Sequence, residues 1–198
     1  DVVGIARHAM SSQLAKDLTF DRLWVHDCEA PGLMALDSLS GADFGGSSVT
    51  VIDSLFENVR RTGIYVAGSS AAITRTVVRD IEGDAGTDTS GRGIYVEESA
   101  LQTGHASTLS GTDSLVFRAR HEAVRVASAS ATLTRLAILD TLTQASDDLG
   151  GIGLGIYARE ETDTPAEVTL AQLGIDGTHE GGLAIEDSIV SIDAMGCQ

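Results

Sequence analysis

The residues of this chain best suited to chemistry are its three tyrosines. Tyr65 and Tyr95 each occupy the third position of the sequence GIYV, and Tyr157 occupies the third position of GIYA. Arg125 takes the corresponding position of the looser copy AVRV. If these four side chains share one surface, their rings and guanidinium group form a flat amphipathic strip. Such a strip could bind the rings of a carbohydrate by stacking.

Two charged residues near the tyrosines could bind the hydroxyl groups of a sugar. Glu97 follows Tyr95 by two positions, and Arg159 follows Tyr157 by two positions. Together with the strip, these two residues make up the predicted carbohydrate site. The alternative is a purely structural role, because tyrosine is a good strand former and stacks with itself on neighbouring strands without any ligand.

These residues belong to a sequence repeat, which would place them at equivalent positions of successive structural units. An element made of glycine, an aliphatic residue, any residue and a second aliphatic residue recurs at intervals of roughly 30 residues. Between its copies, apolar and polar residues alternate over a few positions, as they do in a half-buried strand. This combination predicts a solenoid of stacked parallel strands. The copies begin at Gly4, Gly32, Gly63, Gly93, Ala123, Gly155 and Gly182.

Charged residues between the copies support the register of the repeat. Aligning the β-segments places one charged residue of each at the same position, with a sign that alternates from repeat to repeat. Strands about 4.8 Å apart would bring unlike charges together, whereas like charges would repel. The alternation therefore favours stacking of consecutive repeats. The residues at this position are Arg22, Asp53, Arg75, Asp113 and Arg135.

This pattern resembles the right-handed parallel β-helix family with its pectate-lyase-like fold. The resemblance covers essentially the whole chain and rests on VTVIDSLFENV followed by TGIYVAGS, and on a polar position that would stack into the family's turn ladder. It implies an all-β chain, a single-stranded right-handed parallel β-helix of about six to seven coils with roughly 30 residues per coil. Residues 1–198 would form one such domain of a longer multi-module protein. The turn-ladder residues are Asp27, Asn58, Asp80, Arg118 and Asp140, and the three aspartates are expected to hydrogen-bond the backbone.

Strand alternation also predicts the core, because residues at alternate positions point to the same face. Arg118 in the turn ladder and Ala123 in place of glycine make the fourth coil the least regular. Longer loops interrupt the period at residues 36–48, 82–91 and 143–153, and an acidic loop follows at 159–167. The expected inward residues are Phe20, Val51, Ile73, Leu133, Leu170, Val25, Phe56, Val78, Val116, Ile138, Ile175, Ile64, Val66, Ile94, Val96, Val124, Val126, Ile156, Leu183 and Ile185.

The family resemblance fixes the fold more firmly than the function, since its members include lyases, hydrolases, adhesins and binding modules. Its lyases typically hold Ca²⁺ with acidic residues beside a basic residue, and its hydrolases use aspartates on adjacent coils. The outward positions of the tyrosine strand contain neither set, and the sequence has no HExxH or GxSxG motif. No cofactor is expected, apart from weak Ca²⁺ candidates in the loops at Asp84, Asp88, Asp147 and Asp148.

Composition excludes several classes of partner. The chain has 29 acidic and 13 basic residues, giving a formal net charge of -16. Nucleic acid and anionic membranes are therefore not expected as partners. Cys28 and Cys197 would lie about six coils apart, too far for the Cα–Cα separation of less than about 7 Å that a disulfide requires. We expect both to be free thiols, with pairing to another chain or to sequence outside residues 1–198 as the alternative.

The sequence thus predicts a non-catalytic module that binds carbohydrate, such as plant cell-wall polysaccharide, in a secreted or cell-surface bacterial protein. The first alternative is a polysaccharide lyase or glycoside hydrolase of the β-helix type, and the second is a structural stalk or adhesin module. The segments 1–10 and 189–198 match mid-coil strands without an evident cap. Open strand edges pair readily, so end-to-end self-association is also expected.

Overall fold

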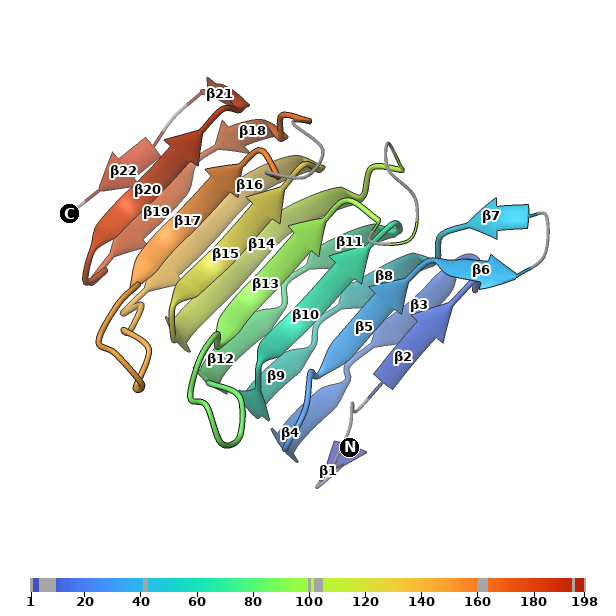
Figure 1. The fold of residues 1–198 in the computed structure, drawn as a ribbon, viewed down its shortest axis with the longest axis horizontal. Coiled ribbons are helices and arrows are strands. Elements are labelled where there is room, and N and C mark those ends of the chain that lie inside the picture. Colours follow the sequence, from blue (N-terminus) through green and yellow to red (C-terminus); the bar gives the residue numbers. More distant parts are fainter. Residues whose placement is uncertain are drawn as a thin grey trace.

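The computed structural model describes residues 2–3, 10–40, 43–99, 101, 105–159, 164–193 and 195–197. Its strands stack along one axis, from the N-terminal coils to the C-terminal coils (Figure 1). Within these ranges, no helix is long and apolar enough to cross a lipid bilayer. The first predicted anchor, Gly4, and the side chain of Cys197 lie outside the described residues.

One sheet contains seven strands, all parallel, and takes one strand from each coil. The predicted parallel stacking, with about six to seven coils, is therefore confirmed. The strands of this sheet, in spatial order, are β2 (Met10–Gln13), β5 (Leu33–Leu36), β10 (Thr62–Ala67), β13 (Arg92–Glu97), β15 (Glu122–Ala127), β17 (Ile152–Tyr157) and β20 (Gly181–Glu186).

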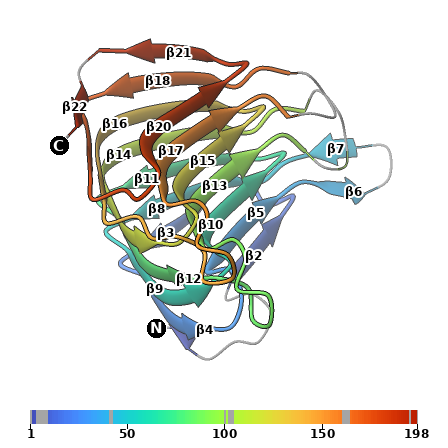
Figure 2. The same ribbon diagram turned by 60° about the vertical axis from the view of Figure 1, so that its left-hand side comes forward.

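The second sheet contains 13 strands and lies behind the first in Figure 1. In most coils a bend separates two short strands, whereas β14 and β16 run through the bend. Figure 2 shows β18 and β21 stacked at the C-terminal end. One rank contains β3 (Leu18–Asp21), β8 (Ser48–Ile52), β11 (Ser70–Thr74), β14 (Thr108–Ala119), β16 (Ser130–Leu139), β18 (Glu167–Ala171) and β21 (Ile189–Ile192). The other adds β1 (Val2–Val3), β4 (Trp24–Cys28), β9 (Leu55–Arg60), β12 (Val77–Glu82), β19 (Leu173–Asp176) and β22 (Met195–Cys197).

The predicted charge ladder lies at the bend of this sheet, and its register is confirmed. Its residues have left-handed backbone angles, for example a φ of 49° at Asp53 and 48° at Arg75. Arg75 donates two hydrogen bonds to Asp53 on the preceding coil, at 2.6 and 2.8 Å. Arg135 binds Asp113 in the same way. Unlike charges therefore meet across neighbouring coils, as the alternation of sign requires.

The turn-ladder residues also have left-handed backbones, with φ between 50° and 55°. The described contacts of Asp27 and Asp80 run to other side chains, rather than to the backbone as expected. The amide of Asn58 donates to Asp27 at 3.4 Å, and Arg118 forms an ion pair with Asp80 at 2.6 Å. Arg118 is therefore no irregularity, because its charge is matched by the coil before it.

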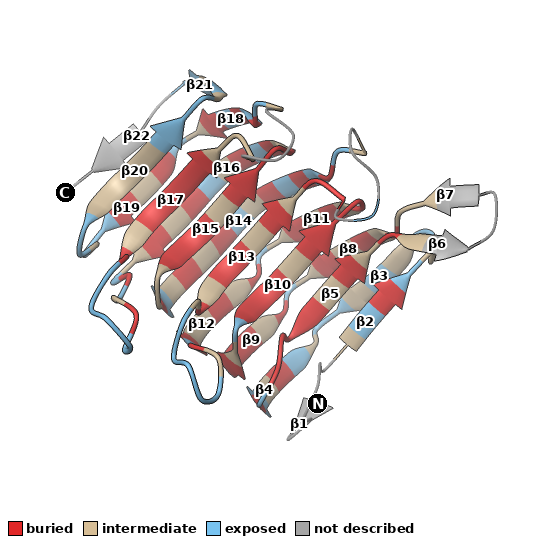
Figure 3. Ribbon diagram, viewed as in Figure 1, coloured by how far each residue is buried: buried red, intermediate tan, exposed pale blue. Residues whose placement is uncertain are grey.

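The predicted core is confirmed over the middle coils (Figure 3). Phe56 and Val96, for example, have no exposed surface. Phe20 and Leu183, near the two ends of the stack, are half-buried. The prediction for Ile185 is wrong, since 47% of this residue is exposed. It belongs to β20, the last strand of its sheet, so no further strand of that sheet covers it.

The predicted anchor Gly155 is displaced by two residues. In β17, Leu154 lies opposite Val124 and Gly155 lies opposite Arg125, so Gly153 takes the anchor position. A Cβ atom added to Gly153 would lie 2.6 Å from the carbonyl oxygen of Gly182 on the next coil, which explains the need for glycine there. A shift of two residues leaves every side chain on its original face. Alternation alone could not reveal it.

The first long loop, predicted at residues 36–48, contains an antiparallel hairpin of β6 (Ser38–Ser40) and β7 (Asp43–Gly45).

Cys28 is buried, and its thiol donates to the carbonyl oxygen of His26 at 3.3 Å.

Candidate functional site

The tyrosines and Arg125 lie on the outer face of the seven-stranded sheet. Tyr65 lies opposite Tyr95, and Tyr95 lies opposite Arg125. Tyr157 is one pleat further along its strand, opposite Ala127. Its ring nevertheless reaches the same row by extending over Gly155, which lies opposite Arg125. A Cβ atom on Gly155 would lie only 2.7 Å from the Tyr157 hydroxyl oxygen, so glycine leaves room for the ring. The four predicted side chains therefore come together despite the shifted register.

These side chains form a column along the sheet. The ring centroids of Tyr65 and Tyr95 are 5.3 Å apart, with 34° between the ring planes. The guanidinium carbon of Arg125 lies 5.7 Å from the centroid of Tyr95 and 4.6 Å from that of Tyr157. Arg92 also lies over the Tyr95 ring, at 4.9 Å. Because the strand spacing is close to the spacing of packed rings, neighbouring side chains of the column pack against one another.

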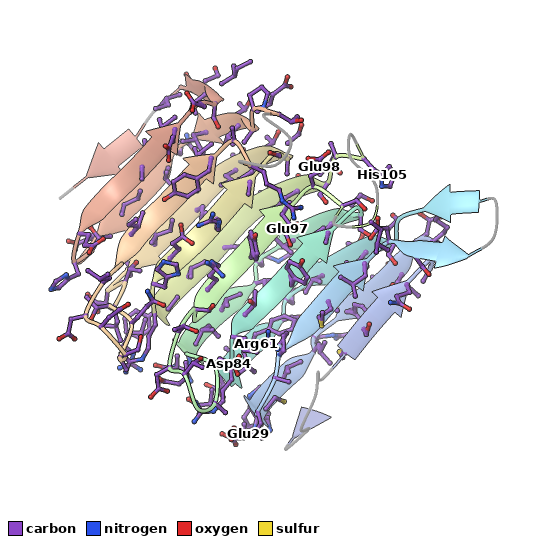
Figure 4. The ribbon with its side chains drawn as sticks, viewed as in Figure 1. Glu29, Arg61, Asp84, Glu97, Glu98 and His105 are labelled. Carbon is purple, nitrogen blue, oxygen red and sulfur yellow. The ribbon has the colours of Figure 1, made fainter. Side chains whose placement is uncertain are left out.

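Glu97, which is labelled in Figure 4, forms hydrogen bonds with the first two tyrosines. Its carboxylate accepts a hydrogen bond from the Tyr65 hydroxyl and another, at 2.5 Å, from the Tyr95 hydroxyl. Burial and the Glu97 charge raise the pKa of both phenols above its usual range. Burial and the neighbouring Glu122 raise the pKa of Tyr157 to about 12. All three phenols thus remain protonated at neutral pH.

Three residues beside the column, Arg92, His121 and Glu122, were not predicted from the sequence. Glu122 is 1% exposed, and its carboxylate accepts a hydrogen bond from Arg92 at 2.8 Å and two from Arg125 at 3.1 Å. Burial alone would raise the pKa of Glu122, but Arg125 and Arg92 outweigh it and hold this pKa below its usual value. The carboxylate is therefore charged. A sequence signal existed, because Arg92 and Glu122 are oppositely charged and one repeat apart.

His121, also not predicted, directly precedes Glu122 in the chain and contacts the end of the loop at 143–153. Its carbonyl oxygen accepts hydrogen bonds from Gly151 and Ile152, at 2.7 and 2.9 Å. Its Nδ1 atom lies 3.8 Å from the Glu122 carboxylate and is buried without a hydrogen-bond partner in the described part of the chain. Burial lowers the pKa of His121, with a further contribution from Arg92 and Arg125 that Glu122 opposes. The imidazole is therefore neutral near neutral pH.

Around these residues the surface is hollowed into a groove of about 720 Å³. A second hollow of about 330 Å³ shares Tyr95 with it and extends to Pro31, Met34 and Tyr65. A third, of about 730 Å³, lies over small residues of the other sheet, where Glu167 is the only titratable residue of its lining. The groove, unlike the third hollow, is therefore lined by several titratable side chains. It is lined by Tyr95, Glu97, His121, Glu122, Arg125, Ala127, Ile152, Tyr157, Ala158, Arg159, Glu186 and Asp187.

The four loop aspartates do not form a metal centre in the described structure. Asp84 Oδ2 lies 3.5 Å from Arg61 Nε (both residues are labelled in Figure 4), and Asp147 accepts a hydrogen bond from the backbone of Leu149 at 3.0 Å. Asp88 and Asp148 occupy left-handed turn positions. Among the residues that the structure describes, no three His, Cys, Asp or Glu side chains are placed to hold a metal ion. The Ca²⁺ hypothesis gains no support from this arrangement.

The environment of His121 predicts a pH dependence. Its neighbours are Glu122, Arg92, Arg125 and Asp147, and burial dominates in lowering its pKa. Below about pH 6.5, the ordinary pKa of histidine, the unfolded chain binds a proton that the folded chain rejects. The free energy of unfolding should therefore fall as the pH is lowered from about 7 towards 5. Urea unfolding followed by circular dichroism tests this, and His121→Asn should show a shallower fall. Equal slopes for both proteins would contradict the assignment to His121.

No protein-family model and no curated protein sequence matches the chain. Among solved structures, the chain is similar to the A-module of the mannuronan C-5 epimerase AlgE6 from Azotobacter vinelandii, with a TM-score of 0.71 and 9% sequence identity. The match covers 99% of this chain and 50% of that structure, so the chain spans half its length. At this identity the likeness shows the fold alone, and it confirms the predicted right-handed parallel β-helix.

Proposed function

From this fold and groove, we propose that the chain is a non-catalytic module that binds polysaccharide across the outer face of its seven-stranded sheet. The observation that carries the proposal is the column of Tyr65, Tyr95, Arg125 and Tyr157, which lines the groove and its neighbouring hollow. The similarity to a module of a polysaccharide-modifying enzyme supports a carbohydrate ligand. A plant cell-wall polysaccharide, and a secreted or cell-surface location, belong to the same proposal.

The groove suits a sugar chain because its polar groups are held in place before binding. Glu97 is fixed by two phenol hydroxyls, and Arg125 is fixed between two rings and Glu122. The Nε atom of Arg125 is buried and has no hydrogen-bond partner among the described residues. Preorganised groups lose little conformational entropy on binding, which favours affinity.

Replacing Tyr95 by alanine tests the column. The variant loses the ring between Tyr65 and Arg125 and the hydroxyl that holds Glu97. We expect polysaccharide retention in affinity gels to weaken by about 1 to 3 kcal/mol, the scale of a lost aromatic contact. Because Tyr95 is half-buried on the outer face, the fold should survive.

The control is the neighbouring residue Val96, which points into the core and has no exposed surface. Val96→Ala should lower the free energy of unfolding by about 2 kcal/mol and leave retention unchanged. If Tyr95→Ala and the parent bind every glycan alike, or bind none, the carbohydrate proposal fails. A structural stalk or adhesin module then becomes the better account.

An enzyme acting on polysaccharide is the second candidate. It is favoured by His121, a neutral imidazole in the groove beside a charged carboxylate, because such a group can accept a proton from a substrate. Release of reducing ends or unsaturated products, or exchange of ring hydrogens with solvent deuterium, would demonstrate catalysis. His121→Asn should then abolish turnover while retaining binding. The absence of any such change on a broad glycan panel would exclude these reactions on the glycans tested.

A further inference from the structure

We infer that the groove selects polysaccharides without carboxylate groups and rejects polyuronates. This inference rests on the proposed function and narrows it to one class of ligand. It follows from how the charges around the column are arranged, since an acidic sugar needs a cation that is available to it.

The guanidinium groups nearest the column are already engaged by the protein. Arg92 and Arg125 both bind the buried, charged Glu122, at 2.8 and 3.1 Å. Both also lie over the ring of Tyr95, and Arg125 lies over Tyr157 as well. A uronate that drew either arginine away would deprive the buried Glu122 of one of its two cationic partners, which is costly.

The remaining charges of the groove are mostly negative. Glu97, Glu186 and Asp187 line it together with a single further arginine, Arg159. Glu186 and Asp187 are exposed at its edge, and Asp147 of the adjoining loop acts on His121. His121 itself is neutral near neutral pH, because burial lowers its pKa. With a net charge of -16 on the whole chain, a polyanion meets repulsion both at a distance and within the groove.

The same groups suit hydroxyl groups well. Carboxylate oxygens accept hydrogen bonds, and those to charged groups are the strong ones. The hydroxyl groups of an uncharged sugar can donate to Glu97 and Glu186 without bringing a charge into the groove. The groups that line the groove therefore repel polyuronates and offer hydrogen-bond partners to uncharged glycans.

Affinity gels with the whole chain test the inference. The probes are an uncharged β-glucan, an uncharged galactomannan, mannuronan and polygalacturonate, with a chelator present so that no divalent cation bridges the acidic chains. Each is run at about 0.01 M and about 1 M NaCl, where screening lengths differ by about tenfold. We expect retention by an uncharged glycan at both salt concentrations, and retention by the polyuronates that is at least about tenfold weaker at low salt.

The double variant Glu186→Gln/Asp187→Asn should increase retention by polyuronates at low salt. The matched control, Asp176→Asn/Asp193→Asn, removes the same charge from exposed positions on the other sheet and should not. Preferential retention by a polyuronate would overturn the inference and leave the proposed function standing. Retention by no glycan would overturn both. An equal gain in both double variants would show that net charge, rather than the groove, sets the preference.

Discussion

Replacing Glu122 by alanine is expected to lower the free energy of unfolding by about 3 kcal/mol and to abolish polysaccharide retention. The substitution removes the buried carboxylate that Arg92 and Arg125 share, and these side chains are only 18% and 27% exposed. Neither guanidinium can fully regain water, so two buried charges lose their partner. Arg125 would then leave its place between Tyr95 and Tyr157, and the column would lose its order. Denaturant unfolding and affinity gels measure the two effects separately.

A surface pair provides the control for this substitution. Glu82 binds Arg120 at 2.7 Å, but its side chain is 48% exposed. Glu82→Ala should therefore cost well under about 1 kcal/mol and leave retention unchanged. If Glu122→Ala behaved like Glu82→Ala in both measurements, the buried network would be irrelevant to stability and to the groove.

The second large effect is expected at Gly93. A Cβ atom at this position would lie 2.5 Å from the carbonyl oxygen of Ala123 on the next coil, closer than atoms can approach. Gly93→Val should destabilise the chain by about 3 kcal/mol, because the backbones of two coils must move apart. Thermal and denaturant unfolding would show the loss.

Gly174 is the matched position, since it also lies in a strand but a Cβ atom there meets nothing within 4 Å. Gly174→Val should be neutral or slightly stabilising, because valine favours strands and restricts the unfolded chain. Equal losses for the two variants would mean that strand glycines matter here for flexibility rather than for the close approach of coils.

The repeat made the fold predictable, because period, alternation and charge sign all specify the same stacking. The predicted register is correct across the long loops at 36–48 and 82–91 and wrong after the loop at 143–153. The loop at 143–153 separates β15 from β17, and a slip of two residues preserves both faces of a strand. The motif GIYA then suggested Gly155, whereas burial of Leu154 and Ile156 in line with Val124 and Val126 selects Gly153.

The site was predictable in part for a related reason. Tyr65, Tyr95 and Arg125 lie in the middle of their strands, where alternation assigns a face. Arg92 and Glu122 begin their strands, where the chain enters from a loop and alternation assigns none. Their pairing depends on two coils meeting in space, which a single strand pattern does not encode. The orientation of the rings likewise follows from contacts between coils.

The charge ladder at the bend has a consequence for how a chain of this kind can change length. Arg22, Asp53, Arg75, Asp113 and Arg135 follow one another from coil to coil, with two Arg–Asp contacts formed across neighbours. Deleting the coil of Asp53 would set Arg22 beside Arg75, whereas deleting the coils of Asp53 and Arg75 together would set Arg22 beside Asp113. Duplicating one coil would likewise place two like charges side by side, where they repel, whereas duplicating two consecutive coils would keep the alternation of sign. The unit in which this solenoid can be lengthened or shortened without electrical mismatch is therefore a pair of turns.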